Sequence, residues 1–173
     1  MKNPYYYIGS NPTVDLVIIN PENKVLMVKR KDDSPACPGM WALPGGFIDT
    51  LAKKGEPWTE GLESPEHAAI REVKEETNLY LENPHLIFVG TFEGNNRDPR
   101  DNETSWSKSY SFLHLIPSEI YESQKEKIVG LDDVSTAIWI PIEKVTEMKL
   151  AFDHNLIVQS ALHKLSKNKK LKF

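Results

Sequence analysis

One short segment constrains this 173-residue chain more than any other part of it. Ser64 is a good N-cap, and Pro65 suits the first helical position, where its missing N–H costs nothing. Asn78 stands where the helix should end, because Asn is second only to Gly in a left-handed C-terminal position. The sequence therefore predicts a helix that begins at Pro65 and ends at Asn78.

This helix should carry an apolar side and a separate carboxylate edge. At about 100° per residue, Glu72, Glu75 and Glu76 share one edge, with Arg71 beside them. Like charges at these spacings disfavour a helix by about 0.2–0.5 kcal/mol per pair. Most glutamate-rich helix edges are simply solvated. Three carboxylates that face one point make sense around a divalent cation, and hard oxygen ligands favour Mg²⁺ or Mn²⁺.

The residues upstream favour the metal-binding interpretation. The sequence Leu43-Pro44-Gly45-Gly46 precedes the helix, and Glu63 stands eight residues before Arg71. Together these segments resemble the Nudix box, which is Gly, five residues, Glu, seven residues, Arg-Glu, an aliphatic residue, any residue, Glu-Glu, any residue, Gly and an aliphatic residue. The positions in register are Glu63, Arg71, Glu72, Val73, Glu75, Glu76 and Leu79.

Two departures from the box matter. Asn78 replaces the closing Gly, and 16 residues instead of five separate Gly46 from Glu63. An insertion around residues 50–61 must therefore loop out, either as a surface excursion or as a lid or dimer contact anchored by Trp58. If the insertion also separated Gly46 from Glu63 in space, the metal site would be incomplete.

The resemblance implies a fold and a site. The expected fold is α/β, a Nudix-type α/β/α sandwich with a mixed central sheet, formed by residues 1–173 as a single domain. The implied cofactor is Mg²⁺ or Mn²⁺, which supplies charge neutralisation and an activated water for pyrophosphate hydrolysis. The implied metal ligands are the Gly46 carbonyl, Glu72, Glu75 and Glu76. Glu72 or Glu75 is the general base, Arg71 orients the carboxylates, and Glu63 supports Arg71.

Other segments predict the remaining elements. Strands are expected at 13–19 and 24–30, joined by a turn, and at 85–92, 110–115 and 137–142. A final helix is expected at 155–166, with Asp153 as its natural N-cap. His154 follows this cap and either is solvated or approaches a substrate.

Four residues are candidates for binding substrate. Arg30 ends a strand and is either solvated or bound to a phosphate, whose oxygens match a guanidinium. Trp41 is either a core or rim aromatic residue or a platform for a base. Arg97 and Arg100 lie in a segment that resembles the Asp-Pro-Arg loop of ADP-ribose pyrophosphatases. They either form a local Asp–Arg turn or grip a pyrophosphate or terminal ribose.

Two acids outside the box complete the candidate site. Asp132 and Asp133 precede a predicted strand, where capping or turn chemistry is one interpretation. The other is that one of them supports the metal, because many Nudix enzymes draw such an acid from a loop outside the box.

Composition excludes several classes of protein. The net charge of −4 argues against a general nucleic-acid binder, and no apolar run approaches the 18 residues of a membrane span. The single cysteine, Cys37, rules out an internal disulfide and fits a reducing compartment such as the cytoplasm. The resemblance implies a small nucleotide substrate as the partner, and composition adds the expectation of no nucleic acid and no membrane. Homodimers are common among similar ADP-ribose enzymes, although the sequence itself is silent on oligomeric state.

The implied activity is metal-dependent hydrolysis of ADP-ribose, or of a close nucleoside diphosphate sugar, to AMP and ribose 5-phosphate. One alternative is a Nudix hydrolase for a dinucleoside polyphosphate, NADH or an oxidised nucleotide. Another is a sensor that binds ADP-ribose without cleaving it. Related sensors add a C-terminal winged-helix domain, for which this chain is expected to end too soon.

Overall fold

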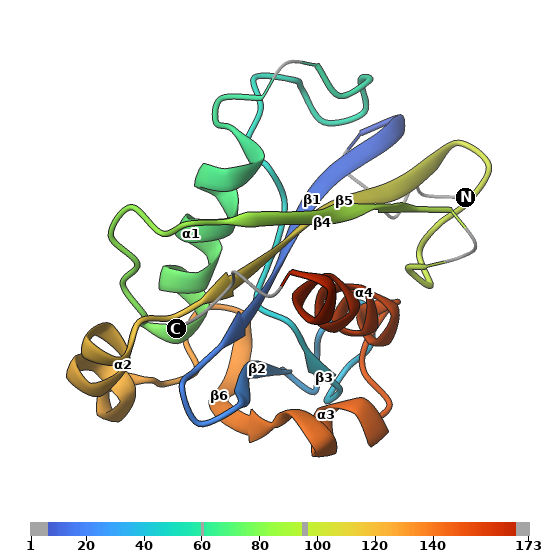
Figure 1. Ribbon diagram of the computed structural model, residues 1–173. Helices are drawn as coiled ribbons and strands as arrows, with labels where there is room; N and C mark the ends of the chain where they lie inside the picture. Colours follow the sequence, from blue (N-terminus) through green and yellow to red (C-terminus); the bar gives the residue numbers. More distant parts are fainter. Residues whose placement is uncertain (1–6, 60, 95–96, 169–173) are drawn as a thin grey trace.

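A six-stranded mixed sheet forms the centre of the protein, in a computed structural model that describes residues 7–59, 61–94 and 97–168 (Figure 1). Its order is β3-β2-β1-β5-β4, and β6 pairs with β2. β1 and β5 are parallel, whereas the other named pairs are antiparallel. The strands are β1 (Gly9–Ile19), β2 (Lys24–Arg30), β3 (Trp41–Ala42), β4 (Ile87–Glu93), β5 (Ser105–Leu115) and β6 (Val134–Pro141).

Helices cover both faces of the long strands. α1 (Pro65–Thr77) and α4 (His154–Lys167) lie on opposite sides of β1 and β5 (Figure 1). Smaller elements are α2 (Ser118–Gln124), the 3₁₀ helix η1 (Lys125–Lys127) and α3 (Ile142–Glu147). The α/β/α sandwich with a mixed sheet is thus confirmed. Among the described residues, no helix is long and apolar enough to cross a membrane.

Alternation along β1 builds the two cores, because successive side chains of a strand point to opposite faces. Leu16 packs in the cluster that contains Val73 of α1. Val17, the next residue, packs in the cluster that contains Ile157 and Val158 of α4. β1 therefore belongs to both layers, and a polar side chain on it lies deep in the molecule.

The local signals around α1 are confirmed. The Ser64 hydroxyl accepts a hydrogen bond from the His67 N–H at 3.2 Å, and Asn78 is left-handed, with a φ of 59°. β2 also has the expected bounds. At α4, Asp153 occupies the predicted N-cap position, but its side chain makes no capping hydrogen bond and instead accepts hydrogen bonds from Arg97.

The insertion folds onto its own chain. A β-bridge between Thr50 and Gly61 closes its base, and the Leu62 N–H donates to the Asp49 carbonyl at 2.7 Å. The Trp58 side chain packs against the core cluster beneath α1. Glu60 lies outside the described residues. The insertion therefore has a closed base, which leaves the residues on either side of it close together, and the role as a lid or dimer contact stays a prediction.

Candidate active site

The glycine pair lies directly against the carboxylate edge of α1. The Gly45 N–H donates to Glu76 Oε2 at 2.9 Å. A Cβ at Gly46 would lie 2.5 Å from Glu72 Oε1, so a side chain there is excluded unless Glu72 moves. The carbonyl of Gly46 accepts a hydrogen bond from the Val14 N–H at 2.8 Å. The insertion thus leaves Gly46 beside Glu72, and the two halves of the box are assembled.

Arg71 holds several groups of the box in place. Its Nη1 donates to Glu72 at 2.8 Å and to Glu75 at 2.9 Å. Its Nη2 donates to Glu63 at 2.6 Å and to the Phe47 carbonyl at 2.9 Å. The hydrogen bond to Glu63, aided by Glu72 and Glu75, raises the pKa of Arg71 above its usual value. Arg71 and Glu63 therefore lie where orienting residues are expected.

The three carboxylates of α1 differ in burial, although Glu72 and Glu75 accept hydrogen bonds from the same Arg71 nitrogen. The Glu75 side chain is 47% exposed and turns toward Arg71, whereas that of Glu72 is 12% exposed. Glu76 is buried. Among the residues that the structure describes, no group of three or more His, Cys, Asp or Glu side chains is placed to hold a metal ion by itself.

Burial leaves two of these carboxylates short of positive charge. Burial raises the pKa of Glu72 to about 7, although Arg71 opposes this shift. Burial also raises the pKa of Glu76 well above its usual value, and Asp133 and Glu72 add to the increase. The Gly45 N–H lowers the Glu76 pKa only in part. This edge of α1 is therefore a place where added positive charge is favourable.

The two acids before β6 have different positions. Asp133 is close enough to Glu76 to hydrogen-bond to it, and it lines the pocket beside the glycine pair. Asp132 has a φ of 48°, does not line the pocket, and accepts a hydrogen bond from Lys31 Nζ through its backbone carbonyl. Of these two candidates, the structure thus brings Asp133, and not Asp132, to the pocket.

A pocket of about 300 Å³ opens beside the glycine pair. Segments that are distant in sequence form its wall, among them the middle of β1, the end of β2, the glycine-pair loop, the loop before β5, and the turn before α4. Its polar lining includes Asp15, Glu76, Arg97, Arg100 and Asp133, and its remaining lining includes Val28, Pro35, Ala42, Phe47 and Phe152. The pocket thus joins Glu76 of α1 to a second, arginine-containing region.

Arg97 lies in the pocket wall, but its guanidinium is bound to the protein. Nε and Nη2 donate to Asp153 at 3.0 and 2.8 Å, Nη2 also reaches Asp15 at 3.3 Å, and Nη1 donates to Ser107 at 3.0 Å. The side chain is 5% exposed. The prediction that Arg97 grips a substrate is therefore corrected, because Arg97 instead fastens its loop to β1, β5 and the start of α4.

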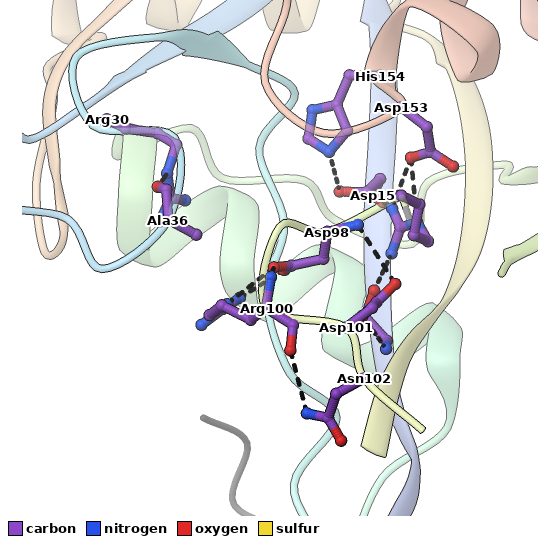
Figure 2. Close-up of polar contacts among 11 residues, drawn as sticks. Asp15, Arg30, Ala36, Asp98, Arg100, Asp101, Asn102, Asp153 and His154 are labelled. Atoms are coloured by element: carbon purple, nitrogen blue, oxygen red, sulfur yellow. Dashed lines mark hydrogen bonds and ion pairs between the residues drawn. The ribbon is translucent and has the colours of Figure 1, made fainter. Parts of the chain in front are cut away.

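Asp15 is a functional-site residue that sequence reasoning missed, and its partner His154, for which the sequence left solvation or approach to a substrate open, is buried. His154 Nδ1 accepts a hydrogen bond from the Leu43 N–H at 2.9 Å, so the ring proton is on Nε2, 3.1 Å from Asp15 (Figure 2). Burial raises the pKa of Asp15, but His154, Arg97 and Ser109 outweigh burial and lower it. The available signal was a lone carboxylate in an otherwise apolar strand.

Arg100 is presented on a rigid turn. Its Nε and Nη2 donate to the two oxygens of Asp98 at 3.0 and 2.7 Å (Figure 2). Asp98 is buried, and its N–H in turn reaches Asp101 at 3.4 Å. The Arg100 side chain is 21% exposed and lines the pocket. A guanidinium held in this way is prepositioned for an anionic ligand.

The remaining two candidates differ in position. Arg30 lines the pocket, donates from Nε to the Ala36 carbonyl at 2.9 Å, and lies over the Phe152 ring at 5.1 Å. Trp41 does not line the pocket and packs against the cluster beneath α4. The predicted substrate-binding role of Trp41 is therefore wrong, and its interpretation as a core or rim aromatic residue agrees with the structure.

Comparison with known proteins gives the family. Residues 9–160 match the family model of the NUDIX domain. The chain belongs to the Nudix family. An ADP-ribose pyrophosphatase from Methanocaldococcus jannaschii is 32% identical over 142 residues, which cover 82% of this chain and 68% of that Nudix relative.

Other Nudix relatives are regulators. An ADPR responsive transcriptional repressor, NtrR, from Acinetobacter baylyi is 27% identical over 160 residues, and the chain spans about half of it (54%). The NUDIX domain of Shewanella oneidensis NrtR, solved with ADP ribose, has a TM-score of 0.67 and 29% identity, covering 91% of this chain and 89% of that one. NrtR from Shewanella oneidensis was also solved with a 27mer DNA, at a TM-score of 0.65 and 30% identity over 90% of this chain and 62% of that one.

Proposed function

We propose that this Nudix protein hydrolyses the pyrophosphate bond of ADP-ribose, or of a close nucleoside diphosphate sugar, to AMP and ribose 5-phosphate. The contact of Gly45 and Gly46 with Glu76 and Glu72 carries the proposal, because it assembles the box across the insertion. The identity to an ADP-ribose pyrophosphatase and the likeness to a Nudix domain solved with ADP ribose support the choice of substrate.

The residues present fit a divalent cation, which Nudix hydrolases generally use. Glu72, Glu76 and the Gly46 carbonyl would hold Mg²⁺ or Mn²⁺, since burial has raised the pKa values of both carboxyls and leaves them favouring positive charge. Mg²⁺ is usually held by one or two carboxylates together with substrate phosphates, so a complete protein cage is not required. When bound, the cation neutralises phosphate charge and lowers the pKa of water.

The protein's own groups take distinct parts in this proposal. Glu75 is the exposed carboxylate of the edge, and Arg71 holds it at 2.9 Å, so we assign to it the removal of a proton from the attacking water. Glu72, pressed against Gly46, is left for the cation. Arg100, fixed by Asp98, binds substrate phosphate. Arg97 keeps the Arg100 loop in position through Asp15 and Asp153.

A second candidate function is an ADP-ribose sensor that does not cleave its ligand. The similarity to an ADPR responsive transcriptional repressor favours it. Because that relative is a repressor and NrtR was solved with DNA, the absence of a nucleic-acid partner stays a prediction. The cytoplasmic location and the homodimer also stay predictions. The retained set of Arg71, Glu72, Glu75 and Glu76 favours the enzyme.

Release of AMP from ADP-ribose, with Mg²⁺ and with EDTA, tests the proposal. NADH, diadenosine polyphosphates and nucleoside triphosphates are assayed in parallel. Metal-dependent cleavage that prefers ADP-ribose is the expected result. Cleavage of another compound would support hydrolysis by the box residues but reject ADP-ribose as the substrate. Binding of ADP-ribose without any cleavage would favour the sensor.

A further inference from the structure

The backbone at Phe152 is unusual. Its φ is 53°, in the left-handed region that bulky side chains avoid. Such conformations persist only where the surroundings impose them, and they cluster at ligand-binding and catalytic sites. Phe152 lines the pocket, so its conformation calls for an explanation in terms of that pocket.

The residues on both sides of Phe152 impose its conformation. The Ala151 N–H donates to the Trp41 carbonyl at 2.8 Å. Asp153 accepts two hydrogen bonds from Arg97, at 3.0 and 2.8 Å. His154 is held between the Leu43 N–H and Asp15. These contacts fix the chain before and after Phe152, so the ring keeps its place in the pocket wall.

The Phe152 ring is paired with a guanidinium that lies over it. The guanidinium carbon of Arg30 lies 5.1 Å from the centre of the Phe152 ring. The His154 ring lies behind it, 5.2 Å between centroids and tilted by 45°. Val28 and Pro35 add apolar walls to the same pocket. This part of the pocket therefore offers stacking and apolar contact, whereas the glycine pair and Arg100 offer contacts for phosphates.

Phe47 is the other phenyl group that lines the pocket, but it belongs to the opposite region. It follows Gly46, and its carbonyl is bound by Arg71 in the box. Trp41, the aromatic residue expected to stack on a base, packs into the core instead. Phe152 is thus the phenyl group placed beside Arg30 and away from the α1 carboxylates.

We infer that Phe152 and Arg30 form the nucleobase subsite. The base of a nucleotide stacks on the pocket-facing side of this Arg30–Phe152 pair, and its phosphates face Arg100 and the α1 edge. Stacking uses the π-face that every base has, so this subsite selects a flat aromatic ring rather than one particular base. The inference rests on the proposed nucleotide substrate, and it adds the residues that separate a nucleotide from a plain sugar phosphate.

Binding of AMP and of ribose 5-phosphate to the full chain, measured by calorimetry, tests this subsite. Ribose 5-phosphate is the matched probe, because it carries a phosphate and a ribose but no base. We expect Phe152→Leu to raise the Kd for AMP about ten-fold, and Phe152→Tyr to restore it. The Kd for ribose 5-phosphate should change less than about two-fold. Phe47→Leu, at the other phenyl group, should not reproduce this selective loss.

Several outcomes would overturn the subsite. In Phe152→Leu, these are an equal loss of affinity for both probes or an unchanged Kd for AMP. A selective loss of AMP affinity in Phe47→Leu would also overturn it. So would wild-type protein that binds AMP no better than ribose 5-phosphate. Phe152→Gly separates binding from folding, since it removes the ring and also relieves the left-handed strain. This variant should bind AMP more weakly than wild type, while its Tm stays at or above that of Phe152→Leu. A lower Tm with unchanged AMP binding would make Phe152 a packing residue.

Failure of the proposed function would look different. Wild-type protein that cleaves no ADP-ribose, yet binds AMP through Phe152, would reject hydrolysis and keep the subsite. If the Phe152→Leu variant cleaves ADP-ribose as efficiently as the wild-type protein does, hydrolysis is kept and the subsite is rejected.

Discussion

Two charged regions face the same pocket, and they are organised in opposite ways. At the edge of α1, Glu72, Glu76 and Asp133 crowd together, and burial and mutual repulsion raise the pKa values of Glu72 and Glu76. In the second region, Asp15 is buried just as deeply, but its pKa is lowered, because Arg97 and His154 supply partners. One region thus favours an added cation, whereas the other is satisfied within the protein.

The comparison teaches how to separate ligand-binding charges from structural ones. Position in the pocket wall does not separate the two kinds, since Arg97 and Arg100 both line the pocket. The hydrogen-bond partners of each guanidinium separate them. Arg97 divides its donors among Asp15, Asp153 and Ser107, which lie on three different elements. Arg100 is held by Asp98 in its own turn and remains directed to the pocket.

Loss of a carboxylate from the α1 edge should have the largest effect. We expect Glu76→Gln to lower turnover of ADP-ribose about 10³-fold, because the site loses a carboxylate that would hold the cation, and the cation neutralises the reacting phosphates. Steady-state kinetics in Mg²⁺ measure this. Glu66→Gln is the matched control, since Glu66 is an exposed glutamate in the first turn of the same helix. Turnover like that of wild type in Glu76→Gln would remove Glu76 from the site.

Loss of the Asp15 carboxylate should lower the free energy of unfolding. Asp15→Asn leaves Arg97 with one fewer carboxylate, and we expect a loss of about 2–4 kcal/mol at pH 7 in urea denaturation. Glu93→Gln, which breaks the exposed pair with Lys108, serves as the control and should change little.

The pH dependence of this loss sharpens the test. Because the folded pKa of Asp15 is lowered from 3.8, its contribution is present above pH 3.8 and is lost as the pH falls through the folded pKa. The difference in the free energy of unfolding between Asp15→Asn and wild type should therefore become smaller below about pH 4. A difference that stayed constant into acid would contradict the assignment of the charge to Asp15.

Glu72 should give the opposite pH dependence. Its folded pKa of about 7 lies above the usual 4.5, so the folded protein binds more protons and its stability falls as the pH rises between these values. In EDTA we expect a decline of up to about 1.4 kcal/mol per pH unit from this group. Glu72→Gln should flatten that slope. An equal slope in both proteins would show that Glu72 is not the titrating group.

The smallest expected effect is that of Arg100. Arg100→Ala should raise the KM for ADP-ribose about ten-fold, because a prepositioned phosphate contact is lost. Its Tm should stay close to that of wild type, whereas Arg97→Ala should lower the Tm clearly. A large fall in Tm for Arg100→Ala with unchanged KM would make the Asp98–Arg100 pair structural.

The same two regions show how far sequence reasoning reaches. The α1 edge could be predicted, because Ser64, Pro65 and Asn78 act through neighbouring residues, and Arg71 lies one turn from Glu75. The Asp15–Arg97–His154 network could not, because its members come from β1, a loop and α4. Only the packed sheet brings them together.

Two features could not be predicted, for related reasons. Helical spacing places Glu72, Glu75 and Glu76 on one edge but does not fix how deeply each carboxylate is buried, and Glu75 is the exposed one. β5 begins at Ser105, well before the expected strand. Its serine-rich half has little intrinsic preference for a strand and is held by parallel pairing with β1.

Binding of Mn²⁺, followed through the EPR signal of the free ion, tests the contrast between the two regions most directly. Wild-type protein and Asp15→Asn should both bind Mn²⁺, because the Asp15 network is satisfied within the protein. Glu76→Gln should bind it at least ten-fold more weakly, because the α1 edge then loses a ligand. Unchanged Mn²⁺ affinity in Glu76→Gln, or its loss in a folded Asp15→Asn protein, would contradict the division of roles described above.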